Sequence, residues 1–310
     1  MRIIHGLPER GLLNSTSVAV GTFDGVHVGH QNLIKRARQE ADARGTDTVV
    51  LTFDRHPLEI IAPERAPRLL TTLPERCALF EALRVDHVVI ADFEHELRDL
   101  SAQRFMDDVL VSRLGATVVC VGERFAFGQG RAGTVETLMT GGAALGFEVR
   151  IAPTVVVDGM PASSSRARQA ILTGEVSVAS AILGRPYRLE GLVVRGDGIG
   201  RTLGFPTANL ATDERIILPG DGVYTVTAAV DGERWIGACS MGCRPTVGGT
   251  RRVLEVHLLD FSGDLYGSTL VVEFVSHLRA QVRFDRLEDL IAQMAIDAEA
   301  ARRQTSIGLR

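Results

Sequence analysis

The sequence predicts two domains, an α/β domain with a parallel sheet and an all-β barrel that ends in a helix. Three observations support this prediction. The chain has 310 residues, about twice the length of a common single domain. Its first half alternates short apolar, β-branched segments with longer amphipathic ones. Its second half has regularly spaced short strands separated by turn residues, which is typical of a barrel.

The first half is expected to alternate strands and helices in chain order. The expected strands cover 17–23, 48–53, 87–91, 117–121 and 147–157. The expected helices cover 28–43, 74–83, 102–114 and 135–144. Near-continuous apolar strands indicate a parallel sheet that is covered on both faces. In such sheets, ligands bind beyond the carboxyl ends of the strands.

A helix expected over 164–183 connects the two halves. We place the boundary after it, which gives domains 1–183 and 184–310. The expected strands of the second domain cover 189–195, 222–230, 234–241, 253–259 and 269–276. Turn signals such as Asp231-Gly232 separate these strands. Apolar residues at helical spacing predict a final helix over 287–302.

Composition excludes several classes of protein. The formal net charge is −4, whereas proteins that neutralise a phosphate backbone usually carry a basic excess. No apolar run is long enough to span a bilayer, and the first ten residues lack the apolar stretch of a secretory signal. The four cysteines are poorly spaced for a zinc site. We therefore expect a cytoplasmic protein with reduced thiols that binds neither nucleic acid nor membrane.

A pair of histidines follows the first expected strand and opens the first expected helix. Gly21 and Gly25 allow the backbone to turn tightly and to approach a ligand. His27 and His30 are three residues apart, so they fall on one face where the helix begins. Two imidazoles beside exposed helix-terminal N–H groups would form a phosphate site. The alternative is a surface pair or a metal-binding pair.

The segment 21–30 resembles the His-x-Gly-His signature of nucleotidyl transferases, in the form found in bacterial bifunctional riboflavin kinase/FAD synthetases. Segments 52–57, 121–128 and 163–168 resemble further elements of this family, with Arg55 in place of a proline and Ser165 in place of a threonine. The resemblance implies a Rossmann-like nucleotidyl transferase domain with His27 and His30 as catalytic residues. The implied nucleotide-binding residues are Gly21, Phe23, Asp24, Gly25, Gly29, Ser164, Ser165 and Arg166.

Two features of this domain leave alternatives open. Hydroxyls and Arg166 at a helix start can hold the phosphates of leaving pyrophosphate, but Ser163–Ser165 can equally cap the linker helix. The family usually carries Asn or Asp where this chain has Arg124, near the implied adenylyl-transfer site. A riboflavin kinase with a degenerate first site is therefore one alternative. Phe125 is implied to contact the flavin.

The second half contains a glycine-rich loop followed by two polar residues. Three glycines within 196–200 allow backbone N–H groups to face phosphate oxygens, although an ordinary turn has the same composition. Beyond Pro206, Thr207 and Asn209 point to one side with period two. Their neutral oxygens suit a magnesium ion that bridges ATP phosphates, or they satisfy backbone groups at a strand end.

Glu255 lies in a strand-like apolar run and is the candidate base for a kinase reaction. If it faces the barrel mouth it can accept a substrate proton, and if it faces water it is an ordinary polar residue. His257 falls on the same face by periodicity, which does not decide between the two.

The run 184–210 closely resembles the start of a riboflavin kinase domain, and 222–226, 242–249, 254–267 and 272–284 continue the resemblance. It implies an all-β riboflavin-kinase barrel in which Thr207 and Asn209 serve Mg-ATP and Glu255 is the base for the ribityl 5′-hydroxyl. Arg279 and Phe284 would neighbour the flavin. The implied nucleotide loop contains Gly196, Asp197, Gly198, Gly200 and Arg201.

The resemblance spans nearly the whole chain and implies ATP-dependent conversion of riboflavin to FMN and then to FAD. Mg²⁺ is the implied cofactor, ATP the co-substrate, and FMN and FAD the products. Riboflavin, FMN and ATP are the implied partners, and a weak homo-oligomer is left open. The further alternative is a non-catalytic, flavin-binding regulator on the same scaffold, which the set of Thr207, Asn209 and Glu255 disfavours.

Overall fold

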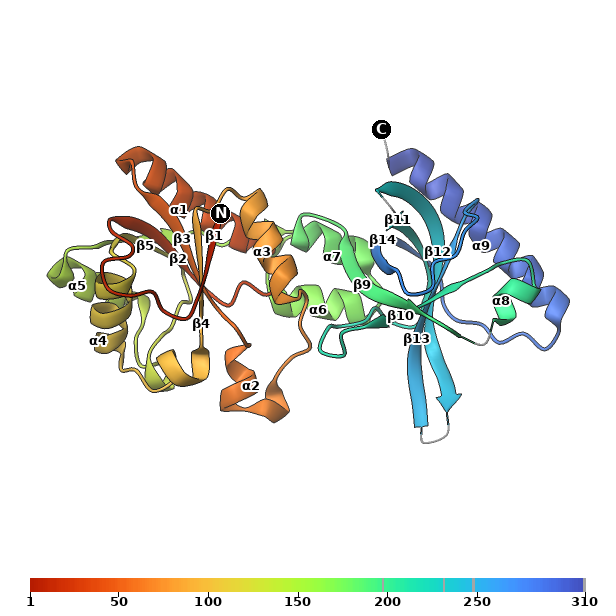
Figure 1. Ribbon diagram of the computed structural model, residues 1–310, viewed down its shortest axis with the longest axis horizontal. Coiled ribbons are helices and arrows are strands. Elements are labelled where there is room, and N and C mark those ends of the chain that lie inside the picture. The colour runs from red at the N-terminus through yellow and green to blue at the C-terminus, as the bar shows by residue number, and fades with distance from the viewer. Residues whose placement is uncertain (197, 231, 247–248, 309–310) are drawn as a thin grey trace. The chain divides into compact units, whose positions relative to one another are not determined.

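The computed structural model describes residues 1–196, 198–230, 232–246 and 249–308 (Figure 1). Contacts divide the chain into two compact units, Met1–Ser164 and Ser165–Arg310. The first contains a parallel sheet and the second a closed antiparallel barrel with a C-terminal helix, which confirms the predicted fold class.

The first unit is built on a six-stranded parallel sheet. Its strands lie in the order β1-β4-β3-β2-β5-β6. They are β1 (Arg2–His5), β2 (Thr16–Val20), β3 (Asp47–Phe53), β4 (His87–Ala91), β5 (Ala116–Gly122) and β6 (Glu148–Ala152). From β2 the chain builds outward first to one side and then, through β5, to the other. The carboxyl ends of β2 and β5 therefore form the switch point at which such sheets bind ligands.

Helices cover both faces of this sheet. They are α1 (Val28–Arg44), α3 (Leu73–Ala82), α4 (Ala102–Arg104), the π-helical segment η3 (Phe105–Arg113) and α5 (Val135–Leu145). The short helix α2 (Pro57–Ile61) buries no residue and packs in neither core. On one face, Ile34 of α1 and Phe80 of α3 share a core with Val50 of β3. On the other face, Leu110 of η3 and Leu138 of α5 pack in a separate core. The sheet is thus the middle of three layers.

The segment expected as one linker helix forms two, α6 (Ser164–Leu172) and α7 (Val176–Leu183). Gly174 lies between them at φ +80°. Glycine adopts this left-handed conformation without steric strain, which allows α6 to end there. Helix α7 buries Val176 and Ile182 and contacts β9 and β14 of the barrel. By contacts, nearly all of this linker therefore groups with the second unit, whereas the sequence boundary at 183/184 assigns it to the first.

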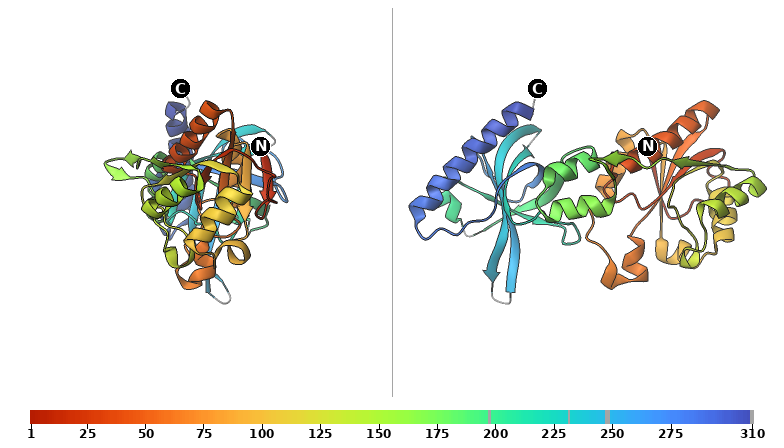
Figure 2. Two further views of the ribbon diagram at one scale, coloured as in Figure 1. Left: turned by 90° about the vertical axis from the view of Figure 1, so that its left-hand side faces the viewer. Right: turned by 180° about the vertical axis from the view of Figure 1, so that it is seen from behind.

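The second unit contains a closed six-stranded antiparallel barrel. Around it the strands lie in the order β10-β13-β12-β11-β14-β9. They are β9 (Tyr187–Val194), β10 (Ala208–Thr212), β11 (Gly222–Val230), β12 (Glu233–Thr246), β13 (Gly249–Leu258) and β14 (Thr269–Arg279). Helix α9 (Leu287–Gly308) contacts β11, β12 and β14, and it lies along the outside of the barrel (Figure 2).

Apolar side chains fill the interior of the barrel. On β13, Leu254, Val256 and Leu258 are buried and alternate with the half-buried Glu255 and His257. Because neighbouring residues of a strand point to opposite faces, Glu255 and His257 lie on the outer face of the barrel. The polar residues of the expected kinase site are therefore outside the barrel and not in its core.

The structure also describes the state of the cysteines and the length of the apolar helices. All four cysteines are free, and Cys77, Cys120 and Cys239 are buried. Burial raises the pKa of the Cys120 thiol to about 12. Across the described ranges, no helix is both long enough and apolar enough to cross a membrane.

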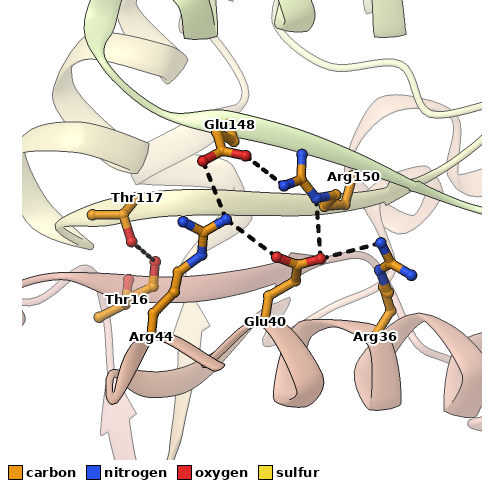
Figure 3. A network of polar contacts seen from close by, with 7 residues as sticks. All are labelled: Thr16, Arg36, Glu40, Arg44, Thr117, Glu148 and Arg150. Carbon is orange, nitrogen blue, oxygen red and sulfur yellow. Dashed lines mark hydrogen bonds and ion pairs between the residues drawn. The ribbon is translucent and has the colours of Figure 1, made fainter. Parts of the chain in front are cut away.

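A charged network ties α1 to the edge strand β6 (Figure 3). Glu40 accepts hydrogen bonds from Arg150 Nε at 3.0 Å and Arg44 Nη2 at 3.2 Å, and it pairs with Arg36 at 3.1 Å. Glu148 completes the network by pairing with Arg44 and Arg150. Burial alone would raise the pKa of Glu40, but the hydrogen bonds and charges of the arginines outweigh it and lower that pKa.

Replacing Glu40→Gln should destabilise the first unit by about 1 kcal/mol near neutral pH, because a networked ion pair is lost. A lowered native pKa stabilises the fold above the ordinary value of 4.5 and loses this effect as the pH falls through the native pKa. Urea unfolding followed by circular dichroism should show the difference from wild type at about pH 7 and its disappearance at about pH 3. Glu81→Gln, at an exposed position of α3, is the control. A difference that persists in acid would contradict the assignment to the Glu40 charge.

Candidate active sites

The loop between β2 and α1 carries the predicted histidine pair. His27 is the N-cap of α1, and its Nδ1 accepts hydrogen bonds from the backbone N–H of Gly29 at 3.1 Å and of His30 at 3.3 Å. A nitrogen that accepts from N–H groups carries no proton, so the proton of neutral His27 is on Nε2. The rings of His27 and His30 stack with centroids 3.6 Å apart. The structure thus brings both imidazoles together, but His27 itself caps two of the N–H groups that the sequence suggested for phosphate.

Gly29 is required by this cap. A Cβ at position 29 would lie 2.9 Å from Cε1 and 3.1 Å from Nδ1 of His27, closer than such atoms pack. Any side chain there would displace the imidazole from the helix terminus. The glycine of the His-x-Gly-His segment therefore serves the orientation of His27.

The tip of the loop is anchored by a buried carboxylate. Asp24 is 2% exposed, and its side chain accepts hydrogen bonds from the backbone N–H groups of Leu70 and Thr71 at 3.0 and 3.2 Å. Thr71 Oγ1 in turn accepts from Gly25 N at 3.0 Å. Asp24, predicted to bind nucleotide, thus fixes the loop to the segment that precedes α3. Ser164 Oγ donates to the backbone oxygen of Asp24 at 2.8 Å.

Arg76 of α3 is a buried cation beneath the same loop, and no pattern in the sequence indicated its role. It is 3% exposed and donates from Nη1 to the backbone oxygen of Thr22 at 2.9 Å. Burial lowers the pKa of Arg76, while the nearby Asp24 charge acts in the opposite direction. Buried hydrogen bonds therefore fix the loop from within the fold at Thr22, through Arg76, and at Asp24.

Aromatic residues near this site have supporting positions. Phe23, predicted among the nucleotide-binding residues, is fully buried and lies edge-on to His30 with centroids 5.2 Å apart. It therefore supports the histidine from the core side. Phe125 is half-buried and stacks on Phe127 at 5.4 Å, in the segment after β5. Arg124, the departure from the family pattern, is exposed in the same segment.

The other predicted residues at this site differ in exposure. Gly21 directly follows β2, and a Cβ there would lie 3.2 Å from the Phe23 ring. Ser165 is exposed and Arg166 is half-buried in the first turn of α6, which belongs to the second unit.

In the barrel, three polar residues form a row across neighbouring strands. Glu255 of β13 pairs in register with Asn209 of β10 on one side and with Ser240 of β12 on the other. Residues directly opposite each other in a sheet point to the same face, so this row lies on the outer face. Glu255 faces a cavity of about 280 Å³ on that face, which resolves its orientation.

The walls of this cavity come from the barrel, from α9 and from the loops beside them. Of the predicted site residues, it brings together Gly198, Gly200, Thr207, Glu255, Arg279 and Phe284. A second cavity, of about 550 Å³, is lined by Arg201, Asp264 and Tyr266 among others. Gly198 and Thr207 line both cavities. Thr207 therefore stands where the two spaces meet.

The glycine loop packs against Asn209 at a distance that only glycine permits. A Cβ at Gly196 would lie 2.4 Å from Asn209 Nδ2. Gly198 follows at φ +71°, and the short helix α8 (Ile199–Thr202) continues the loop. Asp197, also predicted to bind nucleotide, lies outside the described residues.

A buried ion pair joins α9 to the barrel beside the first cavity. Arg279 donates from Nε and Nη2 to the two carboxylate oxygens of Asp297 at 2.9 and 2.7 Å, and Asp297 is 6% exposed. The Arg279 guanidinium lies 6.0 Å from the Phe284 ring centroid. Asp297 was not among the predicted residues, although it continues the helical spacing of the apolar Leu290 and Met294. An acid at that spacing is the signal that indicates a buried partner.

The two sites together define a class of protein, an enzyme with separate nucleotide-transfer and kinase-type centres. The sequence matches the FAD synthetase family over residues 10–166 and the riboflavin kinase family over residues 183–305. The bifunctional riboflavin kinase/FMN adenylyltransferase of Pseudomonas fluorescens is 40% identical over 304 residues, which cover 97% of each chain. That of Escherichia coli K12 is 38% identical and covers 97% of this chain and 96% of its own. The chain belongs to the bifunctional riboflavin kinase/FMN adenylyltransferase family, as its motifs predicted.

A solved structure is similar over nearly the whole length of the chain. It is described as a macrolide-efflux protein from Streptococcus pneumoniae, with a TM-score of 0.89 and 32% sequence identity. The alignment covers 97% of this chain and 99% of that one. Because the chain matches both family regions, the alternative of a kinase with a degenerate first site is not favoured.

Gly29→Ala and Gly196→Ala should separate the two activities. The first should reduce conversion of FMN to FAD by roughly tenfold to a hundredfold through displacement of His27 and leave FMN formation unchanged. Gly196→Ala should slow FMN formation by a similar factor and leave the conversion of FMN to FAD unchanged, because it displaces Asn209 in the barrel. Each variant serves as the folding control for the other, with rates measured from riboflavin and from FMN separately. Loss of both activities in one variant would point to misfolding, and loss of neither would refute the packing argument.

Proposed function

We propose that the chain makes FAD from riboflavin in two ATP-dependent steps, phosphorylation at the barrel and adenylylation at the first unit. The observation that carries this proposal is the position of Glu255, which faces an outer cavity directly beside Thr207 and the glycine loop. The family membership supports the same pair of reactions. The substrates are small molecules, namely riboflavin, FMN and ATP.

In the kinase step, riboflavin occupies the cavity of about 280 Å³ and ATP the cavity of about 550 Å³. The ribityl 5′-oxygen attacks the γ-phosphorus of ATP, and Glu255 accepts the proton that this hydroxyl loses. The bond from the γ-phosphorus to the bridging oxygen breaks, and ADP leaves. Thr207, which lines both cavities, lies where the phosphoryl group passes from one substrate to the other. Phe284 and Arg279 line the riboflavin cavity.

The donor set at this point fits Mg²⁺. Thr207 and Asn209 offer neutral oxygens, and the described part of the chain holds no cluster of three His, Cys, Asp or Glu side chains that would suit another metal. Mg²⁺ keeps several waters and is usually shared between a few protein oxygens and substrate phosphates. When bound, it would neutralise charge on the phosphates of ATP. Thr207 and Asn209 would hold it.

In the adenylylation step, an FMN phosphate oxygen attacks the α-phosphorus of a second ATP, and pyrophosphate leaves. His27 donates its Nε2 proton in a hydrogen bond to the α-phosphate, where negative charge develops. The cap at Nδ1 keeps this tautomer and fixes the ring. His30, stacked on His27, contributes to the same charge stabilisation. Ser165 and Arg166 would bind the departing phosphates.

Product analysis tests both steps. Purified protein with riboflavin, excess ATP and Mg²⁺ should form FMN and then FAD, separated by chromatography over time. Glu255→Gln should slow FMN formation by about a hundredfold or more and leave the conversion of added FMN to FAD intact. A His27→Ala/His30→Ala variant should slow only the second step, by about a hundredfold. FMN as the final product of the unmodified chain would refute the adenylylation step, and binding of riboflavin with neither product would refute enzymatic function.

A further inference from the structure

His257 lies beside the proposed kinase centre without a role so far. Its side chain lies on the outer face of β13, two residues from Glu255, and lines the same cavity. Its Nδ1 is 2.8 Å from the backbone oxygen of Pro206. A carbonyl oxygen only accepts hydrogen bonds, so Nδ1 of His257 must carry a proton. The imidazole also meets the Phe205 ring edge-on, with centroids 5.4 Å apart.

This contact replaces backbone pairing at the point where the sheet ends. Strand β10 pairs with β13 through Ala208–Val256, Asn209–Glu255 and Leu210–Leu254. The next pair in this register would be Thr207 and His257. Pro206, directly before, has no N–H group to extend the ladder. The His257 side chain therefore holds the chain where the backbone ladder stops.

The other side of the same segment is held by the glycine loop. The backbone N–H of Phe205 donates to the backbone oxygen of Gly200 at 2.9 Å. Thr207 therefore follows a two-residue segment that is tied to the loop at Phe205 and to β13 at Pro206. Loss of the second tie frees the peptide that precedes Thr207, while the interior packing of the barrel stays in place.

We propose that His257 is the positioning residue of the kinase centre, which orients Thr207 toward Mg-ATP through a hydrogen bond from Nδ1 to the Pro206 backbone oxygen. This rests on the proposed role of Thr207 in binding Mg-ATP. His257 acts through the backbone of Pro206 and takes no part in proton transfer. The consequence is a defect in the use of ATP and Mg²⁺ more than in the binding of riboflavin.

Three substitutions separate positioning from packing. Asn has a donor nitrogen near the position of Nδ1, Gln has one farther out near the position of Nε2, and Leu has none. His257→Asn should therefore retain most of the kinase activity. His257→Gln and His257→Leu should raise both the KM for ATP and the Mg²⁺ concentration for half-maximal rate by roughly tenfold. His257 lines the proposed riboflavin cavity, so the KM for riboflavin can also rise, but by less than the KM for ATP, because Glu255 and α9 are untouched.

Kinase rates are measured from riboflavin over ranges of ATP and Mg²⁺, and the conversion of added FMN to FAD in each preparation serves as the internal control. Binding of a non-hydrolysable ATP analogue in the presence of Mg²⁺ is measured by calorimetry without riboflavin, and the Gln variant should bind it more weakly at one of the two sites. Equal activity of His257→Asn and His257→Gln would overturn the positioning role, and this pair decides even if the Leu variant does not fold. A loss confined to the KM for riboflavin would overturn it as well.

Thr207→Val is the reference variant. If it alters the Mg²⁺ and ATP dependence and the Gln variant does not, only the role of His257 fails. If it alters neither, the proposed metal role of Thr207 fails first.

Discussion

Closure of the barrel is the constraint on which the second site depends. A six-stranded barrel has an interior just large enough for its own side chains, and here Tyr224, Met241, Val256 and Phe274 occupy it. Because these side chains fill the interior, the polar row that includes Glu255 and Asn209 lies on the outer face. An outer face is normally open to water. Helix α9 and the loops around it turn that open face into a cavity.

In the first unit, the backbone conformation of one loop positions the site. The loop after β2 places Phe23 and Val26, both buried, at positive φ, which costs free energy for side chains of this kind. The surrounding fold maintains this conformation through Asp24, Thr71 and Arg76, none of which is exposed. The result is a short, rigid connection between the middle of the sheet and the first turn of α1. His27 is held at the end of that connection.

The sequence predicted most of the elements but not the relations between them. Strands β4 and β11 were predicted to the residue, since each is an apolar run bounded by turn signals. Strand β1 was missed because it is short and largely exposed at the sheet edge, and β10 because its residues have little preference for strands. Residues within a motif could be proposed from the sequence as members of a site. Arg76 could not, since its partner Thr22 is 54 residues away. The helical spacing of Asp297 indicated a buried position, but not its partner Arg279, which is 18 residues away.

The separation of the two cavities has a consequence for the order of events during turnover. In the proposed kinase reaction each substrate would have a space of its own, and the described residues that line both spaces are Gly198 and Thr207. Neither ligand has to leave before the other enters. The phosphoryl group then passes directly between two molecules held at the same time, and no phosphorylated form of the protein is needed. Steady-state kinetics governed by such a ternary complex give intersecting double-reciprocal lines, whereas a ping-pong enzyme gives parallel ones.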